Sequence, residues 1–184
     1  MTTYVLVRHG ETDWAAAAAA GLVGPASDLA VLSPAGIRQA EKLAAELAAD
    51  PPDELVSSPM TRALQSAHHL ASALGRPMTI EPGLREWNCD RRGTWRDHSE
   101  FVTNFHRLLD EDRGLVPPGD DSVWESLAEV RDRVHDALSR HTGRRVVVVS
   151  HCLAIFALTG TELRPGESLT WSVDGTRGPD RSSV

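Results

Sequence analysis

Four consecutive valines at residues 146–149 constrain the fold more than any other segment of the chain. β-Branched residues favour strands, and a strand that is apolar at every position must be covered on both of its faces. Strands of this kind lie in the middle of mostly parallel sheets, between two layers of helices. We therefore expect a three-layer α/β/α sandwich with a mostly parallel central sheet, in which this run is a central strand.

Short apolar runs and helical patterns alternate along the rest of the chain. Ser33-Pro34 and Ser58-Pro59 each predict a helix start, because serine caps a helix and proline fits its first turn. The second of these helices should end at Gly75, since glycine readily adopts the conformation that terminates a helix. The first should bury a stripe of five apolar side chains: Ile37, Ala40, Leu43, Ala44 and Leu47. Four further strands are expected, the last of them at a sheet edge: 4–7, 54–57, 78–80 and 170–173.

The remaining segments are less regular. Ser122 and Glu125 form a capping-box pattern that predicts another helix, which Gly143 closes. The six alanines at residues 15–20 predict a small-residue loop or a single helical turn. Residues 81–118 mix both charges with aromatic residues, and we expect a loop and one amphipathic helix beside the sheet edge.

Length and composition indicate one soluble domain over residues 1–184, with a loose polar tail at about 175–184. The net charge of −7, from 19 basic and 26 acidic residues, argues against binding to nucleic acid or to acidic membranes. No signal peptide or membrane-spanning run is evident. Cys89 and Cys152 are too few for a disulfide framework, so a cytoplasmic location is expected.

Polar and cationic residues follow three of the expected strands. Arg8-His9 ends the first strand, Ser57-Ser58 the second, and Ser150-His151 the valine strand. Ligands of open α/β sheets bind beyond the carboxyl ends of the strands. Arginine suits phosphate or carboxylate, histidine is a nucleophile near neutral pH, and Gly10 permits a sharp turn and close approach to a ligand. These residues therefore predict a site at one edge of the sheet.

The motifs together resemble the histidine phosphatase (phosphoglycerate mutase-like) superfamily over roughly residues 4–160. The first is Arg-His-Gly-Glu-Thr at residues 8–12, and the second is Ser-Ser-Pro-Met-Thr-Arg-Ala at 57–63. Val149-Ser150-His151 resembles the last motif of the family. Leu-Arg-Glu-Trp at 84–87, followed by Gly-Thr-Trp at 93–95, resembles the element that carries the family's acidic residue.

The resemblance implies a role for each matching residue. His9 would be the nucleophile, and Arg8, Arg62 and His151 would bind the phosphoryl group, with His151 also stabilising transition-state charge. Glu86 would protonate the leaving oxygen. The spacing around Glu86 is stretched, and Asp90 is the alternative. No cofactor is implied, and the other histidines show no metal-ligand spacing.

Two departures from the family pattern bear on activity. The family commonly has Asn and often Arg after the Trp of its first motif, where Trp14 is followed here by alanines. Either phosphate is held by fewer groups, or Arg91 or Arg92, or a backbone N–H of Gly21 or Gly24, replaces those donors. Cys152 stands where the family usually has glycine; we expect a small buried residue there rather than a second nucleophile.

The resemblance implies a metal-independent phosphatase that hydrolyses a small phosphorylated substrate through a phosphohistidine on His9. Two alternatives remain: a phosphoglycerate mutase-type phosphoryl transfer, and a catalytically weak relative that binds a phospho-ligand or a partner. Specificity would come from the segment at about 87–120, a substrate-side insertion, and from the loop after Trp14. The sequence leaves the substrate and the oligomeric state open.

Overall fold

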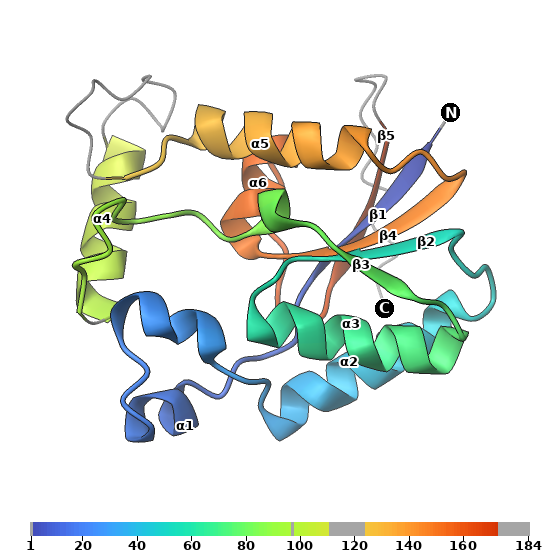
Figure 1. The fold of residues 1–184 in the computed structure, drawn as a ribbon, viewed down its shortest axis with the longest axis horizontal. Helices are drawn as coiled ribbons and strands as arrows, with labels where there is room; N and C mark the ends of the chain where they lie inside the picture. The colour runs from blue at the N-terminus through green and yellow to red at the C-terminus, as the bar shows by residue number, and fades with distance from the viewer. Residues whose placement is uncertain (1, 97, 111–123, 173–184) are drawn as a thin grey trace.

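The computed structural model describes residues 2–96, 98–110 and 124–172 and confirms the expected sandwich (Figure 1). Its five-stranded sheet has the order β3-β2-β4-β1-β5, with the valine strand in the middle. The first four strands in this order are mutually parallel, and the edge strand β5 runs antiparallel to β1. The strands are β1 (Thr3–Arg8), β2 (Glu54–Ser57), β3 (Met78–Ile80), β4 (Arg145–Ser150) and β5 (Ser168–Ser172).

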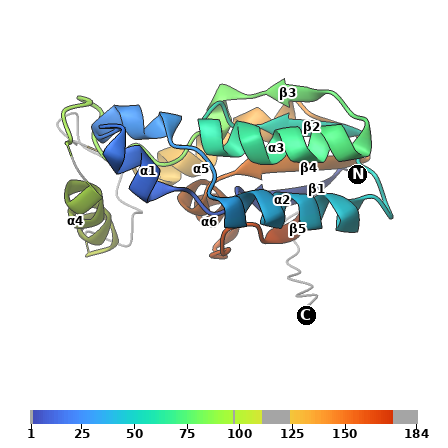
Figure 2. The same cartoon turned by 90° about the horizontal axis from the view of Figure 1, so that it is seen from below.

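Helices cover both faces of the sheet (Figure 2). On one face lie α2 (Pro34–Leu47) and α3 (Thr61–Leu74), and on the other α5 (Leu127–Ser139) and α6 (Cys152–Thr159). Alternate valines of β4 divide between two buried clusters, so that residues 147 and 149 pack with α2 and α3 while 146 and 148 pack with α5 and α6. Burial of both faces is what an all-apolar strand requires.

The start of α2 agrees with prediction in its cap and differs in its buried face. The Ser33 hydroxyl accepts a hydrogen bond from the Gly36 N–H at 3.1 Å. Ile37 is exposed, contrary to the expected stripe, whereas Gly36 is buried. The reason is that the first turn of α2 packs against the loop after β1, which leaves no room for a side chain at Gly36.

Two helix starts differ from the prediction. Helix α3 begins at Thr61 with Met60 as its N-cap, because the Ser58 hydroxyl lies within 2.7 Å of the His151 ring. Its end at Gly75, in the left-handed conformation, is as expected. Helix α5 has a capping box of Ser126 and Glu129 instead of Ser122 and Glu125, and it ends at Ser139, before Gly143. Ser122 lies outside the described residues.

The segments that differ most from a plain sandwich lie beyond the carboxyl ends of the strands (Figures 1 and 2). The alanine run forms a short helix, α1 (Trp14–Ala19), because the Asp13 carboxylate caps it by accepting from the Ala16 N–H at 2.8 Å. The amphipathic helix expected in 81–118 is α4 (His98–Asp110), which lies beyond the strand ends rather than along an edge strand. Two 3-10 helices complete this end: η1 (Gly24–Leu29) and η2 (Pro82–Leu84). The expected loose tail lies outside the described residues.

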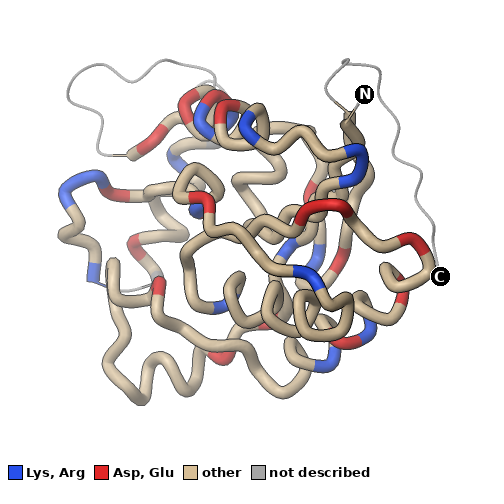
Figure 3. Tube along the Cα trace, turned by 45° about the vertical axis from the view of Figure 1, so that its right-hand side comes forward, with Lys and Arg blue, Asp and Glu red and all other residues tan. Residues whose placement is uncertain are grey.

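Charges of both signs are interspersed along the chain, as Figure 3 shows for the described residues. Among the helices of residues 2–96, 98–110 and 124–172, none combines the length and apolar character that crossing a bilayer requires.

Candidate active site

The three strand ends meet where the sequence predicts. The His9 N–H donates to the Ser150 carbonyl at 3.0 Å, which extends the pairing of β1 with β4 by one residue. The rings of His9 and His151 lie edge to face with their centroids 5.0 Å apart. Arg62, from the first turn of α3, completes the group. Parallel strands therefore place residues that are far apart in sequence around one point.

The His9 ring is held as a neutral imidazole with a defined tautomer. Its Nδ1 lies 2.7 Å from the Gly10 carbonyl, which can only accept, so Nδ1 carries the proton and Nε2 keeps its lone pair. The Arg62 Nε donates to this Nε2 at 3.2 Å. Burial and the charge of Arg62 lower the pKa of His9 to about 3, with a further contribution from Arg8. The ring therefore stays neutral at physiological pH.

The turn after β1 depends on two glycines in direct contact. A Cβ on Gly10 would collide with the Gly36 carbonyl, and a Cβ on Gly36 would collide with the Glu11 carbonyl. Gly10 does not have a positive φ. Its N–H donates to the Ser66 hydroxyl at 3.0 Å. Gly10 is thus required for close approach to α2, a reason different from the sharp turn expected from sequence.

Two guanidinium groups lie beside the His9 ring. Arg62 is buried, its Nη1 donates to the Ser27 carbonyl at 3.3 Å, and it lies over the Trp14 ring. The Arg8 Nη1 donates to the Leu163 carbonyl at 2.7 Å, whereas its buried Nε has no hydrogen-bond partner. A cation in the first turn of a helix is unfavourable by itself, and an anion shared by both groups would compensate.

His151 is completely buried behind this group and is not part of the pocket lining described below. Ser58 accepts from the Met60 N–H at 3.3 Å, and its hydroxyl lies 2.7 Å from His151 Nε2, a hydrogen bond in which either group can donate according to the tautomer of the ring. The buried Nδ1 of His151 has no hydrogen-bond partner. Burial and the charge of Arg62 hold the pKa of His151 well below its usual value, so the ring is neutral.

Glu86 and Asp90, the two candidate acids, have different surroundings. The Glu86 carboxylate lines the pocket and accepts from the N–H groups of Leu153 and Ala154, at 3.3 and 3.1 Å, at the start of α6. The Asp90 carboxylate accepts hydrogen bonds from its own loop, from Arg92, Thr94 and Trp95. Burial alone would raise the pKa of Asp90, but these bonds lower it below its usual value. Both residues line the pocket, but Glu86 faces the start of α6 and Asp90 is tied to its own loop.

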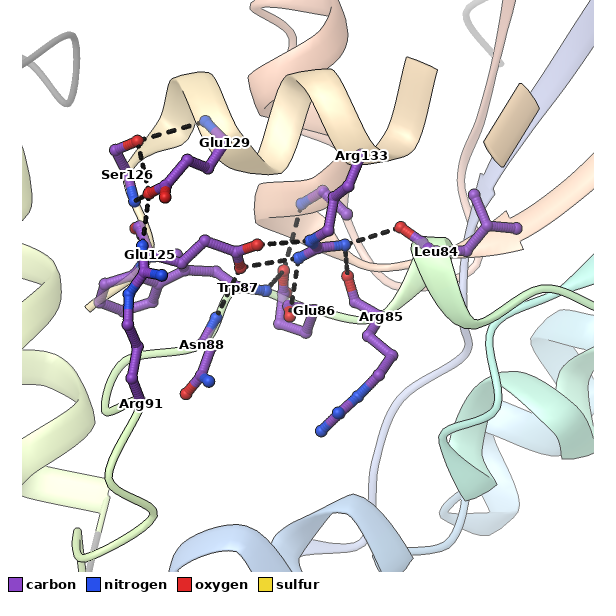
Figure 4. A network of polar contacts seen from close by, with 12 residues as sticks. Leu84, Arg85, Glu86, Trp87, Asn88, Arg91, Glu125, Ser126, Glu129 and Arg133 are labelled. Carbon is purple, nitrogen blue, oxygen red and sulfur yellow. Dashed lines mark hydrogen bonds and ion pairs between the residues drawn. The ribbon is translucent and has the colours of Figure 1, made fainter. Parts of the chain in front are cut away.

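Arg133 of α5 holds the Glu86 segment in place, and the sequence analysis did not identify it (Figure 4). Its Nη1 donates to the carbonyls of Gly83 and Arg85 at 2.7 and 2.8 Å, and its Nη2 donates to the Glu86 carbonyl at 3.1 Å. The Glu125 carboxylate binds the same guanidinium from the other side at 2.6 and 2.9 Å. An arginine on an ordinary amphipathic helix gives no sequence signal of such a role.

Three of the residues expected to replace the missing donors, Arg91, Arg92 and Gly21, are not placed to do so in the structure. Arg91 lines the pocket, but its guanidinium donates to Glu129 and to the Trp124 carbonyl, and Arg92 is not a lining residue. The Gly21 N–H donates to the Ala18 carbonyl. Gly24 has positive φ, and a Cβ there would collide with the Trp95 carbonyl, so the close approach requires glycine; a role for its N–H toward an anion stays a prediction. The sequence did not predict the 3-10 helix η1, which contributes residues to the pocket lining and the Ser27 carbonyl that accepts a hydrogen bond from Arg62.

Cys152 is half-buried and lines the pocket, which corrects the expectation of a buried residue. Burial raises the pKa of its thiol, so it is protonated at neutral pH and is a poor nucleophile, as expected. Within the described residues, no three His, Cys, Asp or Glu side chains come together as metal ligands would.

The pocket that receives these groups has a volume of about 710 Å³. His9, Arg8, Arg62 and Glu86 line one end of it, and aromatic residues line much of the rest. A volume of this size accommodates a small organic molecule. The arrangement can therefore bind an anion beside a neutral imidazole nucleophile, with a carboxyl group at hand.

Comparison with known proteins identifies relatives of the whole chain. The family profile described as histidine phosphatase superfamily (branch 1) matches residues 4–176. Phosphoserine phosphatase 1 of Hydrogenobacter thermophilus is 28% identical over 179 residues, covering 94% of this chain and 81% of that protein. The probable phosphoglycerate mutase GpmB of Escherichia fergusonii is 32% identical over 171 residues, covering 89% of this chain and 75% of that protein. The structure of YhfR of Bacillus stearothermophilus superposes with a TM-score of 0.72 at 23% identity, covering 95% of this chain and 93% of YhfR.

Proposed function

The chain belongs to the histidine phosphatase superfamily, and on this premise we propose that it is a metal-independent phosphatase that hydrolyses a phosphomonoester through a phosphohistidine on His9. The observation that carries the proposal is the state of the His9 ring. It is neutral, its Nδ1 is bonded to the Gly10 carbonyl, and its Nε2 faces the guanidinium of Arg62. A buried nucleophile oriented in this way beside two cations suits attack on a phosphoryl group.

In the first step, His9 Nε2 attacks phosphorus, the N–P bond forms and the bond to the leaving oxygen breaks. Arg62 moves its hydrogen bond from Nε2 to a phosphoryl oxygen, and Arg8 binds a second oxygen through its unpartnered Nε. We assign the third oxygen to Nδ1–H of His151, in the tautomer in which Ser58 donates to Nε2. The charge spread over these oxygens in the transition state is thereby neutralised.

Glu86 supplies the proton that the leaving alkoxide needs. In the second step it takes a proton from water as the water oxygen attacks phosphorus, and the N–P bond breaks to release His9 and inorganic phosphate. Its position at the start of α6, on the pocket wall, supports this exchange.

The proposal is tested by hydrolysis of 4-nitrophenyl phosphate in the presence of a chelator. We expect turnover by the wild type, loss of about four orders of magnitude or more in His9→Ala, and unchanged turnover in His68→Ala, an exposed histidine of α3. Substantial activity in His9→Ala would contradict the mechanism. No wild-type turnover in a folded protein would favour the phospho-ligand-binding alternative.

The mutase alternative is separated by the fate of the phosphoryl group. With a phosphoglycerate as both donor and acceptor, a phosphatase releases inorganic phosphate, whereas a mutase transfers the group to a hydroxyl of the acceptor. We expect inorganic phosphate as the main product. A predominance of isomerised phosphoglycerate would assign the chain to the other activity found among its relatives.

A further inference from the structure

Much of the apolar lining of the pocket is aromatic. Six aromatic side chains line the cavity together with the catalytic group: Trp14, Trp87, Trp95, Phe101, Phe105 and Phe156. Because one continuous cavity of about 710 Å³ holds both sets of residues, a phosphate bound at His9 leaves its organic portion against these rings. The rest of the substrate is therefore recognised mainly by apolar surface.

Four of these side chains form a packed aromatic wall, namely Trp87, Trp95, Phe101 and Phe105. The ring centroids of Trp87 and Phe101 lie 5.4 Å apart, and those of Trp87 and Phe105 lie 6.3 Å apart. Trp95 lies 6.3 Å from Phe101. Trp87 is buried, and its indole N–H donates to the Glu125 carbonyl, so the wall rests on a fixed base. Edge-to-face and tilted packing of this kind holds rings in defined positions.

Three charged groups of the same lining, Arg85, Asp90 and Arg91, already have partners within the protein. Arg85 binds the Asp28 carboxylate at 2.8 Å, and Arg91 binds Glu129. The carboxylate of Asp90 is saturated by its own loop. Among the described lining residues, Arg8 and Arg62 are then the cations that serve the phosphate. A substrate with a second anionic group would have to break one of these ion pairs to find a partner.

We propose that the substrates are phosphomonoesters whose leaving alcohol is apolar, an alkyl chain or an aromatic ring, rather than small polar esters such as phosphoserine or phosphoglycerate. The inference rests on the proposed phosphatase activity and adds the substrate class to it. Apolar surface removed from water on the aromatic wall supplies the selectivity, at roughly a fourfold gain in affinity for each methylene fully buried.

The test is kcat/KM along a series of straight-chain alkyl phosphates from ethyl to hexyl, with phosphoserine alongside. The alcohols of this series have nearly the same basicity, so chemistry contributes equally and differences report binding. We expect kcat/KM to rise about two- to fourfold per methylene, and hexyl phosphate to exceed phosphoserine by at least about tenfold. An equal kcat/KM for ethyl and hexyl phosphate, or a preference for phosphoserine, would overturn the inference.

Variants locate the effect on the wall. Phe105→Ala should lower kcat/KM for hexyl phosphate by about five- to tenfold and leave ethyl phosphate nearly unchanged. Val102→Ala, an exposed residue of the same helix outside the pocket lining, should change neither. Equal loss for both esters in a folded Phe105→Ala would contradict a role in selectivity. If that variant does not fold, the wild-type series decides alone.

The results distinguish failure of the apolar substrate class from failure of the phosphatase activity. Failure of every ester, including 4-nitrophenyl phosphate, would refute the phosphatase activity itself. Turnover of all esters without a chain-length dependence would refute the apolar substrate class and leave the phosphatase in place. Phosphoserine turnover that Arg85→Gln abolishes would also refute it, because Arg85 would then leave Asp28 to bind a substrate carboxylate.

Discussion

The two ends of the pocket are built by different means. The end that we propose to bind phosphate, the phosphate-binding end, consists of residues at the ends of β1, β2 and β4 and in the first turn of α3. Its histidines are buried and neutral, and they are hydrogen-bonded to the Gly10 carbonyl and the Ser58 hydroxyl. The opposite end consists of loops and short helices beyond the sheet, with an aromatic wall and paired surface charges. The first end suits one reaction, whereas the second can vary without disturbing it.

Glu86 connects the two ends. Its segment belongs to the loops beyond the sheet, yet its carboxylate lies at the start of α6 within the phosphate-binding end. Arg133 and Glu125 fasten this segment to α5. Variants at the phosphate-binding end, at the aromatic wall and at the Glu86 segment should therefore differ in which substrates they affect.

The largest effect is expected for Arg62→Met at the phosphate-binding end. Loss of the guanidinium removes transition-state stabilisation, and kcat/KM should fall by about 10³ for alkyl and aryl phosphates alike. The pKa of His9 should rise from about 3, because the Arg62 charge is one of the causes that lower it. NMR titration of the histidine ring measures this shift. Arg91→Met, in the loop that carries Trp95, is the control, and an equal loss there would break the distinction between the two ends.

A smaller, substrate-dependent effect is expected for Arg133→Met. If Arg133 positions Glu86, kcat for an alkyl phosphate should fall about 10- to 100-fold, within the range that general acid catalysis contributes. With 4-nitrophenyl phosphate, whose leaving group needs little protonation, kcat should change little. Arg131→Met, on an exposed arginine of the same helix, serves as the control. A uniform loss with both substrates would indicate a structural role only.

The smallest effect concerns stability in acid. The pKa of His9 is lowered in the folded state, so between about pH 6.5 and 3 the unfolded chain binds more protons than the folded one. The free energy of unfolding should therefore fall as the pH is lowered, by about 1.4 kcal/mol per pH unit from this group. Urea unfolding of wild type and His9→Gln at pH 7 and pH 4 isolates the contribution. The variant should lose less stability, and an identical loss would mean that His9 is protonated when folded.

The sequence predicts well which residues converge at the ends of the parallel strands, and the reason is physical. Parallel strands of one sheet end at the same edge, so polar residues after β1, β2 and β4 must meet, and the valine pattern identifies the central strand. His9, Arg8, Arg62 and Glu86 all line the pocket, and His151 lies directly behind His9.

The errors concern features that tertiary contacts decide. Ser122 with Glu125 and Ser126 with Glu129 have the same spacing, and the second pair caps α5 because Glu125 binds Arg133. Ser58 is bonded to His151 and so leaves the cap of α3 to Met60. Neither choice is determined by local sequence. The same holds for the aromatic wall, whose residues show no periodicity that announces a shared surface.

The central claim is that His9 carries the phosphoryl group during turnover. The most direct measurement is rapid quench of the enzyme with a phosphomonoester under alkaline conditions, which preserve phosphohistidine, followed by ³¹P NMR and peptide mapping. The account predicts a phosphoramidate on the peptide that contains His9, formed in the first turnover and absent from His9→Ala. Steady hydrolysis with no phosphorylated enzyme, or a phosphorylated His9→Ala, would contradict it.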